Sequence, residues 1–217
     1  MNVHLVKTGI ANVASVTAAL KRLGATVTPT ADPGVIASAA AVVLPGVGAF
    51  RAGMETLKER GLAAALRTRI HGDQPTLAVC LGLQLLTQAS DEAPGVRGLG
   101  VLPVSARKLE GAPRLPHFGW NRVRVDSGPE GRETLLRSGD AYFAHTFGVV
   151  NDSRLRESGW TTALTTEGTT FVSAVERGSV LACQFHPELS GAFGADLIQR
   201  WMTRAAAAPR SEEAVSW

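Results

Sequence analysis

The chain has 217 residues, of which 45% are hydrophobic and 19% charged, with a formal net charge of +3. This size and mix predict one folded domain with its own hydrophobic core, and they exclude a disordered or fibrous chain. The interspersed charges argue against a nucleic-acid-binding face, the two cysteines are too few for a disulfide scaffold, and no apolar run approaches the roughly 18 residues of a membrane span. The first residues carry no basic leader before a long apolar run, so no signal peptide and a cytoplasmic location are expected.

The first half of the chain alternates strand and helix patterns. A short strand is expected at 3–6, followed by an amphipathic helix whose apolar residues recur up to Leu23 and which ends at Gly24. Further strands are expected at 25–30, 41–44 and 76–80, and further helices at 51–60, 62–70 and around 83–86. This alternation is typical of a parallel sheet covered by helices on both faces.

The second half is richer in short runs of Val, Thr and Phe separated by Gly, Pro and Asp. These runs predict antiparallel strands and hairpins at 101–108, 122–125, 141–145, 161–165, 171–175 and 180–184. A last helix is expected over about 194–207, and the tail 211–217 is expected to be loose. The fold class is therefore α/β: a mostly parallel central sheet flanked by helices, with an added antiparallel β portion in the second half, in a single domain over residues 1–217.

Cys80 lies where an apolar strand meets a helical pattern. A nucleophile at such a junction sits on a sharp turn above the carboxyl ends of the strands. The turn needs small neighbours two residues away, and Ala78 and Gly82 provide them. The following helix directs its N-terminal amides toward the sulfur and favours the thiolate, the form that attacks carbon. A buried structural cysteine is the alternative unless a base can be found elsewhere in the chain.

A base for this cysteine is available in the segment that follows the apolar strand 180–183. In an extended segment, residues two apart face the same way, so His186 and Glu188 are expected to lie on one side. Pro187 between them ends strand pairing and stiffens the pair. A carboxylate beside an imidazole holds its tautomer and stabilises the imidazolium formed after proton transfer. Cys80, His186 and Glu188 are therefore the predicted catalytic residues.

Two patterns raise the alternative of a bound cofactor or metal. The run Gly46–Gly48 after a strand invites a dinucleotide-binding interpretation, but Arg51 occupies the place of the third glycine. Cys183, His186 and His145 could supply zinc ligands, although no tight ligand spacing supports such a site. Neither a cofactor nor a metal is expected.

The same glycine loop suits a catalytic role. Gly46, Val47 and Gly48 can bring backbone N–H groups close to a developing oxyanion, where one donor contributes about 10²–10³ in rate. The amide of Leu81, just past the nucleophile, is a natural second donor. A plain strand-to-helix turn is the structural alternative for this motif taken alone.

In this order, the three elements resemble those of the class I (triad) glutamine amidotransferases. The shared family marks are Cys-Leu-Gly-Leu-Gln at 80–84 and Phe-His-Pro-Glu at 185–188. Within the family, three further runs are similar to those of glutaminase subunits of imidazole glycerol phosphate synthases: Leu-Pro-Gly-Val-Gly-Ala-Phe at 44–50, Pro-His-Phe-Gly-Trp-Asn at 116–121 and Tyr-Phe-Ala-His-Thr-Phe at 142–147. The resemblance covers nearly the whole chain.

The resemblance implies hydrolysis of L-glutamine to glutamate and ammonia. Cys80 would attack the side-chain amide and form a γ-glutamyl thioester. His186 would act first as an acid toward departing ammonia and then as a base toward water, and Glu188 would orient it.

The resemblance also implies how glutamine is held. Gln84 and the backbone around Thr146 and Phe147 would bind its amino-acid end. The loop of Gly46, Val47 and Gly48 would supply the oxyanion donor after a peptide reorients.

A partner is implied as well. In the family, ammonia passes to a separate (β/α)₈ cyclase subunit of a heterodimer. There a phosphoribulosyl-formimino carboxamide ribotide (PRFAR) gives imidazole glycerol phosphate and an aminoimidazole carboxamide ribotide (AICAR). Asn12, Trp120 and Asn121 are the candidates for the subunit interface.

Two positions and one segment depart from the family pattern. Ala78 stands where glycine is usual, and Phe147 stands where tyrosine is common, which removes a hydroxyl contact. Residues 7–12 match the usual Asp-x-Gly-x-x-Asn pattern only loosely.

Three alternatives remain open. The first is a glutaminase subunit of another synthase, of the anthranilate or aminodeoxychorismate type, although the run 116–121 argues against it. The second is a free-standing γ-glutamyl hydrolase or peptidase, which would be active alone. The third is a non-catalytic binding module, although every member of the triad is present.

Overall fold

The computed structural model describes residues 1–8, 13–127 and 133–208. One sheet of nine strands runs through the molecule in the order β2-β1-β3-β4-β11-β10-β9-β6-β7. The parallel half consists of β2 (Thr26–Thr30), β1 (Asn2–Val6), β3 (Val42–Leu44), β4 (Thr76–Val79) and β11 (Val180–Cys183). The antiparallel half continues through β10 (Thr169–Arg177), β9 (Thr161–Glu167), β6 (His117–Ser127) and β7 (Gly139–His145). The short strands β5 (Ala106–Lys108) and β8 (Phe147–Val149) pair separately.

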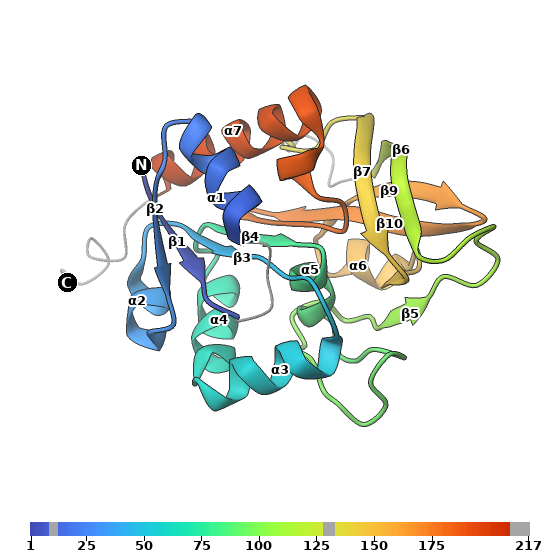
Figure 1. The fold of residues 1–217 in the computed structure, drawn as a ribbon, viewed down its shortest axis with the longest axis horizontal. Coiled ribbons are helices and arrows are strands. Elements are labelled where there is room, and N and C mark those ends of the chain that lie inside the picture. The colour runs from blue at the N-terminus through green and yellow to red at the C-terminus, as the bar shows by residue number, and fades with distance from the viewer. Residues whose placement is uncertain (9–12, 128–132, 209–217) are drawn as a thin grey trace.

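Helices cover both faces of the parallel half (Figure 1). On one face lie α1 (Val13–Arg22) and α7 (Gly191–Ala207). On the other lie α2 (Pro33–Ser38), α3 (Phe50–Glu59), α4 (Leu62–His71) and α5 (Leu81–Leu85). The short α6 (Ser153–Glu157) and the 3₁₀ turn η1 (Pro187–Leu189) complete the elements. No helix of the described residues is long and apolar enough to cross a bilayer.

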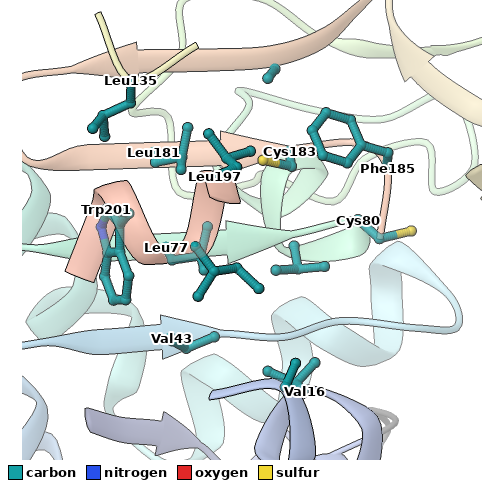
Figure 2. Packing of buried hydrophobic residues seen from close by; sticks show 14 of the residues in the cluster. Val16, Val43, Leu77, Cys80, Leu135, Leu181, Cys183, Phe185, Leu197 and Trp201 are labelled. Carbon is teal, nitrogen blue, oxygen red and sulfur yellow. The ribbon is translucent and has the colours of Figure 1, made fainter. Parts of the chain in front are cut away.

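Alternate strand residues supply two separate cores, because successive side chains point to opposite faces of a sheet. Leu77 of β4 and Leu181 of β11 pack with Leu197 and Trp201 of α7 (Figure 2). Ala78 of β4 belongs to the opposite core under α3, α4 and α5. The parallel strands β4 and β11 are thereby fixed side by side, and their carboxyl ends meet at one edge.

Most of the predicted elements are confirmed, and the α/β fold class holds. The strand predicted at 101–108 is wrong over 101–105, because those backbone groups pair with the end of α5 and the loop after it: Leu102 N donates to Leu86 O, and Gln88 N donates to Val104 O. The strand 180–184, grouped with the antiparallel ones, is β11 and also pairs in parallel with β4. The tail 211–217 lies outside the described residues.

Besides the 3₁₀ turn η1, three short elements were not predicted. Helix α2 has Asp32 as its N-cap, accepting from the amides of Gly34 and Val35, and helix α6 is capped in the same way by Asp152. Both caps are sequence signals that could have been recognised. Strand β8 has only three residues, too few for any periodicity to be visible.

Candidate active site

Cys80 sits at the carboxyl end of β4 as the N-cap of α5, with φ 53° and ψ −109°. A positive φ is unfavourable for a residue with a side chain, and such strain persists where the surroundings enforce it. Here the amide of Cys80 donates to the carbonyl of Cys183 at 2.7 Å. Gly82 is required by close packing, because a Cβ there would lie 2.3 Å from the carbonyl oxygen of Leu44. The predicted sharp turn is therefore present, and it lifts the sulfur above the sheet edge (Figure 2).

His186 lies just beyond the carboxyl end of β11, the strand next to β4. Its backbone is fixed on both sides: its amide donates to Tyr142 O at 2.9 Å, and its carbonyl accepts from Ser190 Oγ at 2.6 Å. Its Nδ1 lies 2.9 Å from Oε1 of Glu188. The expectation of an extended segment is wrong, since residues 187–189 form a 3₁₀ turn. Pro187 begins this turn, which brings the carboxylate back toward the ring.

The electrostatics favour a protonated His186. Burial works to lower the pKa of His186, but hydrogen bonds to Cys80 and Glu188, together with the charges of both groups, raise it above its ordinary value. With Nδ1 directed at Glu188, Nε2 is the nitrogen that faces the sulfur. An imidazolium between a thiolate and a carboxylate can deliver a proton to a leaving group and then take one from water.

A cleft of about 220 Å³ opens beside the sulfur. It is lined by Val47, Gly48, Cys80, Leu81, Gln84, Glu92, Pro116, Phe118, Ala144, His145, Thr146 and Phe147. The structure thus brings most of the predicted glutamine-binding residues to one cleft. Gln84 is further fixed within it, because its Nε2 donates to the carbonyl of Phe147 at 2.7 Å.

The predicted oxyanion donors are in a closed arrangement. The amide of Leu81 donates to the carbonyl of Gly46 at 3.3 Å, so this N–H is occupied. Gly46 does not line the cleft but packs on the nucleophile turn, where a Cβ would lie 2.7 Å from the amide nitrogen of Gly82. Gly48 has φ +97°, a conformation open to glycine.

Two residues of the site were missed by sequence reasoning. Gln184 is fully buried, and its Nε2 lies 3.7 Å from the sulfur of Cys80. A glutamine at the end of an apolar strand was a visible signal. Glu92 brings a carboxylate to the cleft and accepts from the amide of Phe50 at 3.0 Å. Its place in a polar loop offered no comparable signal.

The interface candidates are placed differently from one another. Trp120 is 59% exposed, and its neighbour on the same side of β6, Phe118, is 66% exposed. Asn121 lies on the other side of the strand, where its amide donates to Thr166 O and Glu167 Oε2. Asn12 lies outside the described residues.

Across the residues that the structure describes, no group of three or more His, Cys, Asp and Glu side chains could hold a metal ion. Cys183 of the zinc alternative is fully buried, and burial raises the pKa of its thiol. Such a thiol stays protonated and packs as an apolar group.

Comparisons with known proteins identify the family and the fold of the chain. The family model of class-I glutamine amidotransferases matches residues 5–205. A Moorella thermoacetica protein named imidazole glycerol phosphate synthase subunit HisH is 38% identical over 199 residues, which cover 92% of this chain and 93% of that protein. The subunit of the same name from Carboxydothermus hydrogenoformans is 41% identical over 189 residues, covering 87% and 92%. In fold, the chain is similar to the glutaminase domain of Trypanosoma brucei CTPS solved with bound acivicin, with a TM-score of 0.70, 16% identity and coverage of 96% and 95%.

Proposed function

The chain belongs to the class I glutamine amidotransferases, and from that premise we propose that it is the glutaminase subunit of an imidazole glycerol phosphate synthase. It hydrolyses L-glutamine to glutamate and ammonia, and the ammonia passes to a cyclase subunit that makes imidazole glycerol phosphate and AICAR from PRFAR. The observation that carries the proposal is the approach of Cys80, His186 and Glu188 at the carboxyl edge of β4 and β11. One glutamine amidotransferase domain over residues 1–217 and a cytoplasmic location form part of the proposal.

The reaction follows from this geometry in two steps. The Cys80 thiolate attacks the amide carbon of glutamine, and His186 gives its proton to the departing nitrogen, which leaves as ammonia with a γ-glutamyl thioester behind. Water then attacks the thioester while His186 takes its proton, releasing glutamate and regenerating the thiolate. Glu188 holds Nδ1 of His186 throughout, so that Nε2 keeps facing the reacting atoms.

The closed oxyanion loop explains why such a subunit would be slow by itself. Both steps place negative charge on the former amide oxygen, and the Leu81 N–H suited to bind it is occupied by the carbonyl of Gly46. Rotating the Gly46–Val47 peptide would free that donor and turn the amide of Val47 toward the same position. The flanking glycines favour such a rotation.

The amino-acid end of glutamine is bound at the far side of the cleft. Glu92 offers a carboxylate to the α-ammonium group, and Thr146 and Phe147 line the same cleft. Gln84 stabilises that wall through its bond to Phe147 O. Phe147 contributes backbone here, so the absence of a tyrosine hydroxyl leaves this role unaffected.

A group of exposed apolar side chains, called the rim below, supports the proposal that a partner subunit binds at the cleft. Among the described residues, the exposed large hydrophobic side chains are Val47, Phe118, Trp120 and Leu189. Val47 and Phe118 line the cleft itself, and Trp120 lies against Tyr142 with ring centroids 6.2 Å apart. Exposed aromatic residues gathered at a cleft mouth are typical of a protein-binding surface. A docked cyclase subunit would cover the cleft and receive ammonia directly.

The proposal is tested by glutamate release from glutamine, measured with the chain alone and with the cyclase subunit plus its nucleotide substrate. We expect slow release alone and an increase of about 10²-fold or more in the mixture, because one freed oxyanion donor contributes about 10²–10³. Brisk release alone, unchanged by the partner, would instead establish the free-standing hydrolase. No glutamate release in either condition would favour the non-catalytic binding module. Activation by an anthranilate-type synthase subunit and not by the cyclase would establish the other amidotransferase.

A second prediction concerns the rim. Trp120→Ala should weaken binding to the cyclase about 30- to 700-fold, because truncating a central interface aromatic costs about 2–4 kcal/mol. Titration calorimetry with the purified subunits measures this directly. Gln199→Ala, on the exposed side of α7, is the matched control and should bind like the wild type. Equal affinity of the wild type, Trp120→Ala and Gln199→Ala for the cyclase would show that the interface does not include this part of β6.

A further inference from the structure

A buried pair of histidines lies beside the cleft and takes no part in the proposed triad. His117 of β6 and His145 of β7 occupy directly opposed positions in the antiparallel pair, and each is 5% exposed. Phe143 stacks on the His117 ring with centroids 4.9 Å apart, and Phe171 meets both imidazoles edge-on. Burying imidazoles is costly unless their nitrogens have partners. Their hydrogen bonds therefore indicate what the pair holds in place.

The direction of these bonds is determined by the acceptor at one end. Nδ1 of His145 lies 3.0 Å from the carbonyl oxygen of Phe147, which can only accept, so the proton is on Nδ1. Burial lowers the pKa of His145 to about 3, so the ring is neutral and its Nε2 accepts from Nδ1 of His117 at 3.4 Å. Nε2 of His117, which then carries no proton, faces the amide nitrogen of Asn121 at 3.4 Å. The orientation of that amide is fixed, because its Oδ1 accepts from Arg122 N at 2.7 Å.

The same carbonyl connects the histidines to the nucleophile. Phe147 O accepts a second bond from Gln84 Nε2 at 2.7 Å. Gln84 Nε2 also donates to Gln184 Oε1 at 3.2 Å, and Gln184 Nε2 lies 3.7 Å from the sulfur of Cys80. An unbroken series of contacts thus runs from the strand β6 through His145 to the reacting atom. Within it, Phe147 O is the point where the two halves meet.

We propose that His145, held in its tautomer by His117, is a positioning residue that fixes the Phe147 carbonyl and with it the glutamine-binding wall of the cleft. The inference rests on the proposed function, since it assigns the wall to glutamine. Thr146 links β7 to β8, Phe147 begins β8, and both residues line the cleft. The bond from His145 Nδ1 ties this segment to the sheet, so a substrate meets a preformed surface. Misplacing such a surface by about 1 Å can cost about 10²-fold in rate.

The test compares two reagents for Cys80 in the isolated chain. An electrophilic diazoketone analogue of glutamine must occupy the cleft before it alkylates the sulfur, whereas iodoacetamide needs only the sulfur. His145→Phe keeps an aromatic ring beside Phe143 and Phe171 but removes both hydrogen bonds. We expect analogue labelling of this variant to slow at least about 10-fold, with iodoacetamide labelling within about 2-fold of wild type. His145→Asn can again donate to Phe147 O, and it should restore most of the analogue rate.

The controls separate this inference from the proposed function. His71→Asn, at the exposed end of α4, should label like the wild type with both reagents. If the wild type itself is not labelled at Cys80 by the analogue, the proposed function fails, and the inference fails with it. If wild type and His145→Phe react equally with the analogue, only the positioning role is overturned. Equal slowing with both reagents, without rescue by His145→Asn, overturns it as well, because the residue would then be merely structural.

The tautomers of the two histidines can also be measured directly in the wild-type chain. Long-range ¹H–¹⁵N spectra of the imidazoles distinguish the two neutral tautomers. We expect His117 and His145 both to carry the proton on Nδ1. A proton on Nε2 of His145 would break its bond to Phe147 O and overturn the proposal.

Discussion

Replacing Cys80 with alanine is expected to lower glutamine hydrolysis by at least about 10⁴-fold while leaving the fold and partner binding intact. The reaction passes through a thioester on this sulfur, and no other described nucleophile faces the cleft at the same point. The fold should tolerate the change, because the sulfur contacts groups of the site, namely His186, Ala144 O at 4.0 Å and Gln184 Nε2 at 3.7 Å, and the backbone of the turn is unaltered. Ammonia supplied directly should still support synthesis by the complex. Glutamate release and ammonia-driven product formation are the two measurements.

Cys183→Ala is the matched control for this variant. It removes the same atoms from the other cysteine, which is fully buried in the core beneath α7 (Figure 2). Its glutaminase activity should stay close to wild type, and any loss should appear in the free energy of unfolding. Residual glutaminase activity of a few per cent in Cys80→Ala would contradict the thioester. Loss of ammonia-driven synthesis would show that the chain does more than supply ammonia.

The sequence could predict those parts of the site that depend on local chemistry. The turn at Cys80 follows from a strand, two small neighbours and a helix, all within a few residues. The pairing of His186 with Glu188 was predicted correctly as a contact but for a wrong local reason. The carboxylate comes back to the ring through a 3₁₀ turn. An extended segment and a 3₁₀ turn can both bring His186 and Glu188 together. The predicted contact was therefore correct although the predicted backbone conformation was wrong.

Features that depend on strand register could not be predicted in this way. His117 and His145 are 28 residues apart in sequence, and they meet because β6 and β7 pair in one particular register. A shift of that register by one residue would place the two rings on opposite faces of the sheet. The closed state of the oxyanion loop depends on one peptide orientation, and the expectation that a peptide must reorient came from the family resemblance and not from the residues themselves.

Glu188→Gln is expected to lower kcat/KM for glutamine by about 10²- to 10⁴-fold and to change its dependence on pH. Glu188 makes its bond to His186 through Oε1, and within the described residues its buried Oε2 has no hydrogen-bond partner. Its charge is therefore directed at the imidazole and contributes to raising the pKa of His186. The neutral amide removes that contribution, so the pKa of His186 falls in the variant. The imidazolium that protonates departing ammonia is then lost at a lower pH.

The sign of the effect can be checked in both activity and stability. A histidine whose pKa is raised by folding stabilises the protein fully below its unfolded pKa of about 6.5, and this stabilisation is lost as pH rises through the folded value. Through His186, the wild-type chain gains more stability at pH 6 than at pH 9, and Glu188→Gln should make this difference in unfolding free energy smaller. The same variant should move the alkaline limb of the kcat/KM profile to lower pH. Glu176→Gln, which removes a buried carboxylate bonded to Leu135 N, should lower stability without moving that limb. An unmoved alkaline limb in Glu188→Gln would mean that the carboxylate orients the ring without tuning its proton affinity.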